Sequence, residues 1–168
     1  DLRARHDKAA SITARVLHAV AEHSVIVERS VRTTIRPGVS LPRSELTATM
    51  QAAWEEHRII CVSGPAGSGK SGLVKTVFDL AKPQGLAVAF RAESFGVPHL
   101  NDVFAPHGFR LDGLRALAAL HPRKWIWIES VERLLEKSER HAFMDLMRLV
   151  ADDPSWRLFA RDFDADGD

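Results

Sequence analysis

The chain has a single cysteine, no long apolar stretch and almost no net charge, and each of these absences excludes a class of protein. One cysteine, Cys61, cannot build a disulfide framework, and it falls in a segment that we expect to be a buried strand. A reducing compartment, and hence a cytoplasmic location, is therefore expected. No apolar run approaches the roughly 18 residues of a membrane span, and no apolar segment follows a basic start as in a secretory signal. The net charge of +1 predicts no whole-chain attraction to nucleic acid or to anionic membranes.

The composition that remains is that of an ordinary globular protein, with 45% hydrophobic and 27% charged residues. At 168 residues the chain can form one good core with a small appendage. We expect an N-terminal helical segment at residues 1–36 and a core domain at 37–168, because prolines and a glycine break the chain within 36–43. The chain starts without Met and stops abruptly, so we expect a fragment that is incomplete at its C-terminal end.

The main chemical signal is the stretch Gly64-Pro65-Ala66-Gly67-Ser68-Gly69-Lys70-Ser71, which satisfies G-x-x-x-x-G-K-S/T, the Walker A pattern of a phosphate-binding loop. Backbone N–H groups of such a loop point inward and suit phosphate oxygens, and the three glycines allow positive φ angles. Lys70 is predicted to reach the β- and γ-phosphates and Ser71 to ligate Mg²⁺, with Gly72 following in the nucleotide-binding set. The alternative is a glycine-rich turn that matches by chance, on the order of 1 in 100 for a chain of this length.

Hydrophobic periodicity predicts strands that alternate with helices. The expected strands are 58–63, 86–90, 125–128 and 156–160. The expected helices are 2–24, 45–57 with Ser44 as N-cap, 70–82, a short one at 100–104, 111–120, and one around 143–150 with Ser138 as N-cap. Residues 25–36 fit either a strand at Val25–Val27 or a continued helical stripe. This alternation predicts a three-layer α/β fold with a parallel sheet.

A second chemical signal is Glu129, which directly follows the apolar run Trp125-Ile126-Trp127-Ile128. Ligands of parallel α/β sheets lie outside the carboxyl ends of the strands, so this acid is the candidate Mg²⁺ ligand and a candidate catalytic residue. The arrangement resembles a Walker B motif in which Glu replaces the usual Asp, and the extra methylene moves the carboxylate outward. The alternative is a surface glutamate that closes a strand.

With these two motifs the chain, over about residues 40–161, resembles P-loop NTPases of the AAA+ and STAND types, which include NACHT proteins. Glu129-Ser130-Val131-Glu132 is similar to the Asp-x-hydrophobic-acid arrangement of the STAND class, which implies that Glu132 is a general base; otherwise it is a solvated residue of the next turn. Leu41-Pro42-Arg43-Ser44-Glu45-Leu46 resembles the box that borders adenine, which implies a nucleotide contact for Arg43. Arg161 ends a segment in the place of the sensor strand, which implies a position near the γ-phosphate, although Ala160 departs from the usual Thr or Ser.

The resemblance implies ATP and Mg²⁺ as cofactors and a nucleotide-dependent switch with slow hydrolysis to ADP and phosphate, in a signalling or defence protein. Its partners would be a second copy or other domains of the same protein. The alternatives are a nucleotide-binding interaction or oligomerisation module without turnover and, less favoured because no acceptor site is evident, a small-molecule kinase. A lid and an arginine finger cannot be placed, so this chain alone is expected to be a very weak ATPase. The segment 162–167 matches the start of an EF-hand loop, but the glutamate that ends such a loop is missing, so we expect only an acidic tail.

Overall fold

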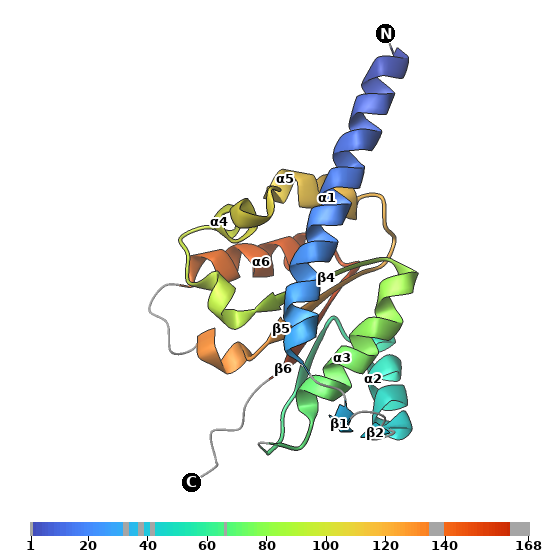
Figure 1. The fold of residues 1–168 in the computed structure, drawn as a ribbon, viewed down its shortest axis with the longest axis vertical. Coiled ribbons are helices and arrows are strands. Elements are labelled where there is room, and N and C mark those ends of the chain that lie inside the picture. The colour runs from blue at the N-terminus through green and yellow to red at the C-terminus, as the bar shows by residue number, and fades with distance from the viewer. Residues whose placement is uncertain are drawn as a thin grey trace.

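The computed structural model describes residues 2–31, 34–36, 39–40, 43–65, 67–134 and 140–161, and within these ranges the side chains of residue 10 onward except those of 34–36 and 39–40. Its centre is a four-stranded parallel sheet with the strand order β3-β6-β5-β4. The strands are β3 (Ile59–Val62), β4 (Leu86–Arg91), β5 (Lys124–Glu129) and β6 (Trp156–Arg161). The predicted α/β class with a parallel sheet is thus confirmed (Figure 1).

Helices pack against both faces of this sheet. The α-helices are α1 (Leu2–Ser30), α2 (Ser44–Glu56), α3 (Lys70–Ala81), α4 (Leu100–Phe104), α5 (Leu111–Ala118) and α6 (His141–Asp152). Short 3₁₀ turns follow several elements: η1 (Lys82–Gln84), η2 (Ala92–Phe95), η3 (Ala105–His107) and η4 (Val131–Leu134). Before α2 the chain forms a small antiparallel ribbon of β1 (Thr34–Arg36) and β2 (Val39–Ser40). The sequence suggested a continued helical stripe up to residue 36 and a break in the chain within 36–43.

Side chains alternate between the two faces of each strand and so build two cores. Helices α2 and α3 share one core with Trp125, Trp127 and Phe159. Helices α4, α5 and α6 share the other with Ile126, Ile128 and further strand residues. The chain crosses the whole sheet from β3 to β4 through α3, then returns through α5 and α6 on the opposite face. Right-handed crossovers require this change of face when the direction of travel reverses.

Helix α1 packs beside β4 and contributes to both cores, through Val20 in one and Val27 in the other. The Ser24 hydroxyl accepts a hydrogen bond from the Ala89 N–H of β4 at 3.0 Å, so α1 covers an edge of the sheet. The suggested strand at Val25–Val27 is wrong, because these residues continue the helical stripe that packs on this edge. The division of the chain at residue 36 stays a prediction.

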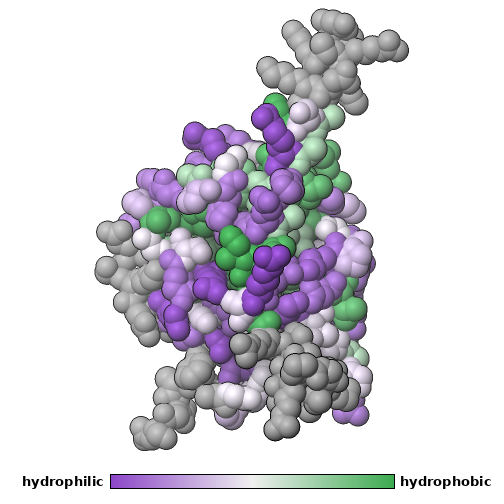
Figure 2. Space-filling model, viewed as in Figure 1, coloured by the Kyte–Doolittle hydropathy of each residue, from purple (hydrophilic) through white to green (hydrophobic). Residues whose placement is uncertain are grey.

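The N-terminal part of α1 stands clear of the body in Figure 1. The face shown in Figure 2 is mainly hydrophilic, with apolar residues gathered along α1. Three apolar side chains of α1, Ile12, Leu17 and Ile26, are 43%, 45% and 58% exposed. None of the helices in the described ranges combines the length and the apolar character that a membrane crossing needs.

Three local predictions are wrong. Ser44 is the first residue of α2, with Arg43 at the N-cap position, and α6 has Arg140 there instead of Ser138. Cys61 is exposed, because β3 pairs on one side only within the described sheet and its side chains are alternately exposed and half-buried. Several predicted features lie outside the described residues, namely Leu41, Pro42, Ala66, Ser138 and the acidic tail 162–168.

Candidate functional site

The glycine-rich loop joins β3 to α3 at the carboxyl end of the sheet. Gly64, Gly67 and Gly69 have φ angles of 146°, 74° and 83°, so the predicted need for glycine at these positions is confirmed. The Ser68 N–H donates to the Pro65 carbonyl at 3.2 Å and closes a turn. The loop thus leads directly into the first turn of α3, whose N–H groups lack helical acceptors.

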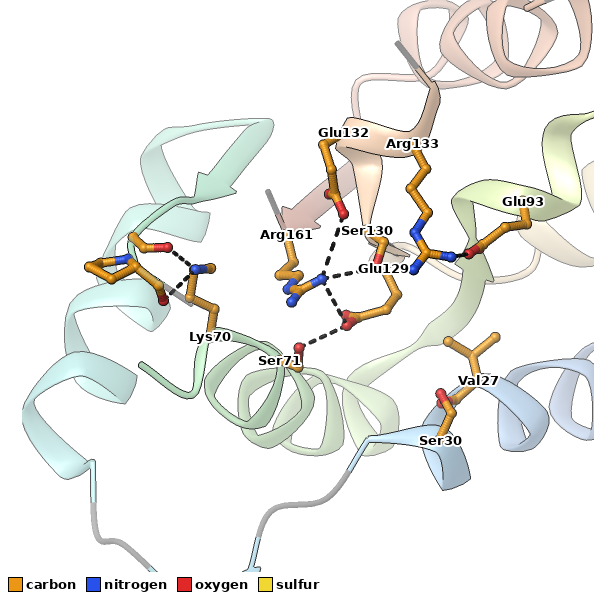
Figure 3. Close-up of polar contacts among 12 residues, drawn as sticks. Val27, Ser30, Lys70, Ser71, Glu93, Glu129, Ser130, Glu132, Arg133 and Arg161 are labelled. Carbon is orange, nitrogen blue, oxygen red and sulfur yellow. Dashed lines mark hydrogen bonds and ion pairs between the residues drawn. The ribbon is translucent and has the colours of Figure 1, made fainter. Parts of the chain in front are cut away.

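Lys70 begins α3 and is only 6% exposed. Its ammonium donates to the carbonyl oxygens of Gly64 and, at 2.8 Å, Pro65, and therefore lies over the loop (Figure 3). The lysine is thus held at the concave loop that we predicted for phosphate. Its contact with β- and γ-phosphates stays a prediction.

Ser71 and Glu129 come together as predicted, although they are 58 residues apart. The Ser71 hydroxyl donates to Glu129 Oε1 at 2.7 Å, from the first turn of α3 to the last residue of β5. The strand that carries the acid is not beside the loop strand, however, because β6 lies between them. The acid still meets Ser71 because α3 begins at the same end of the sheet at which β5 ends.

The Glu129 carboxylate and the Ser71 hydroxyl form an oxygen donor set that fits Mg²⁺, which is often held by one or two carboxylates together with substrate phosphates. One observation tests this fit: Glu129 Oε2 is buried and has no hydrogen-bond partner among the described residues. A carboxylate oxygen is therefore available to a cation. Within the described ranges no group of three or more His, Cys, Asp or Glu side chains forms an all-protein metal site.

Arg161, the last residue of β6, connects the two predicted acids. Its Nη1 atom donates to Ser130 Oγ at 2.9 Å and lies 3.5 Å from Glu129 Oε1 and 3.9 Å from Glu132 Oε1. The side chains of Arg161, Glu129 and Glu132 are 16%, 12% and 21% exposed, so water screens these ion pairs less than pairs on the open surface. The structure therefore places Glu132 and Arg161 in one cluster with Glu129.

Ser130 has an unusual backbone, with a φ angle of 61°. A serine rarely adopts positive φ, and such strain clusters at functional sites. Its carbonyl accepts a hydrogen bond from the Arg133 N–H at 3.1 Å, which closes the turn η4, while its hydroxyl faces Arg161. The strained turn brings Glu132 back toward the carboxyl end of the sheet.

Arg43 lies behind the loop. Its guanidinium donates to the carbonyls of Gly69 and, at 3.0 Å, Ser68. A β-carbon built on Gly69 would be 1.9 Å from Arg43 Nη2, so this close approach requires glycine. In its described contacts Arg43 acts as a clamp that holds the carbonyl groups of the loop. Its position next to adenine stays a prediction.

A cleft of about 480 Å³ opens beside this cluster. It is lined by Ser30, Val31, Gly69, Ser71, Gly72, Arg91, Glu93, Glu129, Ser130 and Arg133. Arg91, Glu93 and the end of α1 belong to none of the predicted motifs. Glu129 was predicted because it is a polar residue directly after a buried strand. The same criterion applies to Arg91, which directly follows the predicted strand 86–90.

No protein-family model matches this sequence, and no curated protein is similar enough to count as a relative. The interpretation of the site therefore depends on its residues and their geometry.

Proposed function

We propose that this chain binds ATP·Mg²⁺ through the loop 64–69 and the start of α3, and that it acts as a nucleotide-dependent switch of the P-loop NTPase class with slow hydrolysis. In this proposal the loop N–H groups and Lys70 hold the phosphates, and Ser71 and Glu129 hold the metal. The bound metal would neutralise charge on the phosphates.

The observation that carries this proposal is the 2.7 Å contact between Ser71 and Glu129. The two residues belong to separate sequence patterns: Ser71 ends the glycine-rich loop, and Glu129 is an acid that follows an apolar strand. If the glycine-rich segment were only a turn that matches by chance, a hydrogen bond between its last serine and the acid of a second motif would not be expected. The contact therefore favours a phosphate and metal site over a structural turn.

Slow hydrolysis is the expected outcome because few fixed cations are in place for the terminal phosphoryl group. Arg161 is held by Ser130 and two carboxylates, and Arg133 is ion-paired with Glu93. Glu132 is the candidate general base. An arginine finger contributes about 10³–10⁵ in rate where it is present, so we expect turnover by this chain below about 1 s⁻¹.

The decisive experiment is calorimetric titration of the purified chain with ATP and Mg²⁺. Lys70→Ala removes the loop ammonium and should weaken affinity by at least about tenfold, or 1.4 kcal/mol. Lys75→Ala is the matched control, since this lysine is on the same helix but pairs with Asp79 at 2.6 Å. Equal affinities of the Lys70→Ala variant and the unmodified chain would refute the proposal.

Two further arms test the metal and the turnover. Glu129→Gln should reduce the Mg²⁺ dependence of binding, whereas removal of residues 162–168 should not. A phosphate-release assay then distinguishes the switch from an interaction module, because the module binds ATP with no turnover at all. Rapid turnover by a monomer would instead contradict the expectation of slow hydrolysis.

A further inference from the structure

Three charged side chains form a row along the carboxyl end of the sheet. Arg91 and Glu129 are register partners on the neighbouring strands β4 and β5, and Glu129 pairs with Arg161 of β6 at 3.5 Å. Side chains alternate along a strand, so these residues lie on the same face as Ala89, Trp127 and Phe159. This is the face that α3 covers, and the row therefore lies where α3 begins.

The arginines near the cleft differ in their partners. Arg161 is bound by Ser130, Glu129 and Glu132, and Arg133 is bound by Glu93. Arg91 is exposed, and no hydrogen bond or ion pair connects its side chain to any residue that the structure describes. It is thus the arginine of this group whose donors are not already engaged.

The charges in the cleft follow from these pairs. The charge of Arg133 is compensated by Glu93, and the charge of Glu129 is compensated by Arg161, which is not one of the residues that line the cleft. Among the described residues of the cleft, Arg91 is left as the cation without a compensating acid, and the cleft also contains Gly69 and Ser71 at the end of the predicted phosphate-binding loop. An arginine presents five N–H donors in a planar fork that fits phosphate oxygens. The group that best complements it is an anion next to Ser71.

We propose that Arg91 binds the terminal phosphoryl group of a nucleoside triphosphate held in the loop, and so makes this site prefer a triphosphate to a diphosphate. The inference rests on the proposed function, because the loop must bind the nucleotide first. A diphosphate lacks the group that would meet Arg91. Arg91 is therefore a specificity-determining residue that the predicted motifs do not include.

The experiment compares the affinities for ADP and for a non-hydrolysable ATP analogue with an imido bridge between the β- and γ-phosphates, both with Mg²⁺. Arg91→Ala should weaken binding of the analogue by about tenfold and leave ADP affinity unchanged. Arg91→Lys should restore part of the preference, since it keeps the charge but loses the planar fork. The control is Arg110→Ala, another exposed arginine, which precedes α5 on the opposite face of the sheet.

The outcomes separate the two proposals. If the unmodified chain binds neither nucleotide, the proposed function fails and the role of Arg91 fails with it. If it binds both, and Arg91→Ala weakens both by the same factor or neither, the role of Arg91 is refuted while the proposed function stands. Arg91 has no described partner to lose, so the thermal unfolding midpoint of Arg91→Ala should match that of the unmodified chain. A lowered midpoint would also contradict the proposal, because it would give Arg91 a structural role.

Discussion

Alanine substitutions at two loop glycines should separate backbone strain from the effect of the Arg43 clamp. Gly67 and Gly69 have similar φ angles of 74° and 83°. A β-carbon on Gly67 meets nothing within 4 Å, whereas one on Gly69 would be 1.9 Å from Arg43 Nη2. The two substitutions therefore share the strain, and only Gly69→Ala displaces the arginine.

The strain of an L-residue with a left-handed backbone is about 1–2 kcal/mol, so Gly67→Ala should lower the free energy of unfolding by this amount. Gly69→Ala also removes the hydrogen bonds from Arg43 to the carbonyls of Gly69 and Ser68. Hydrogen bonds from a charged donor contribute about 1.5–3 kcal/mol. These two are partly exposed, so we take about 1–2 kcal/mol for both together. The expected loss for Gly69→Ala is then about 2–4 kcal/mol.

Urea unfolding of both single variants, of Arg43→Ala and of the double variant Arg43→Ala/Gly69→Ala measures these terms. In the Arg43→Ala background, Gly69→Ala should lower the free energy of unfolding only by the backbone strain. The double-mutant cycle should therefore give a coupling energy between Arg43 and Gly69 of about 1–2 kcal/mol. Equal losses for Gly67→Ala and Gly69→Ala, together with no coupling, would refute the clamp.

Two further predictions concern the contact of α1 with β4. Burial and the neighbouring His107 lower the pKa of His23 from 6.5 to about 4, so the unfolded chain takes up a proton first as the pH falls. The contribution of His23 to the free energy of unfolding is therefore fully present above about pH 6.5, and the free energy decreases toward pH 4 by up to about 3 kcal/mol. His23→Phe should flatten this part of the pH profile measured by urea unfolding. An unchanged profile would contradict the assignment. Ser24→Ala leaves the buried Ala89 N–H without its acceptor and should cost about 1–3 kcal/mol in urea unfolding. Ser30→Ala removes a part-buried hydroxyl that donates to the Val27 carbonyl of the same helix, and no buried N–H loses its acceptor, so it should cost clearly less; equal losses would refute a special role of the Ser24 contact.

The strands and the centre of the site were predictable because they depend on local patterns. Trp125–Ile128 is apolar on both faces, as expected for a central strand of a parallel sheet with helices on each side. A residue that directly follows such a strand must lie at the carboxyl end of the sheet. The contact between Ser71 and Glu129 therefore followed from two motifs and one general rule, without knowledge of the strand order.

The features that the sequence did not predict depend on which elements become neighbours. Nothing local to residues 156–161 indicates that β6 inserts between β3 and β5. Helix α1 continues to Ser30 because it packs against the edge strand β4. The sequence of Val25–Val27 does not show that this strand lies beside it. Arg91 belongs to no motif and becomes notable only when β4 is placed beside β5.

The fold by itself says little about function, because parallel α/β sheets with helices on both faces carry many unrelated activities. The residues of the site, rather than the fold, favour nucleotide binding. Three loop glycines have positive φ angles, as the predicted phosphate-binding loop requires, and the buried Lys70 places a cation at this loop. Ser71 is hydrogen-bonded to Glu129, the proposed metal ligand, at the end of that loop. We therefore propose a ligand that combines phosphate with a divalent cation, as a nucleotide bound with Mg²⁺ does, and the titrations with ATP and Mg²⁺ test it.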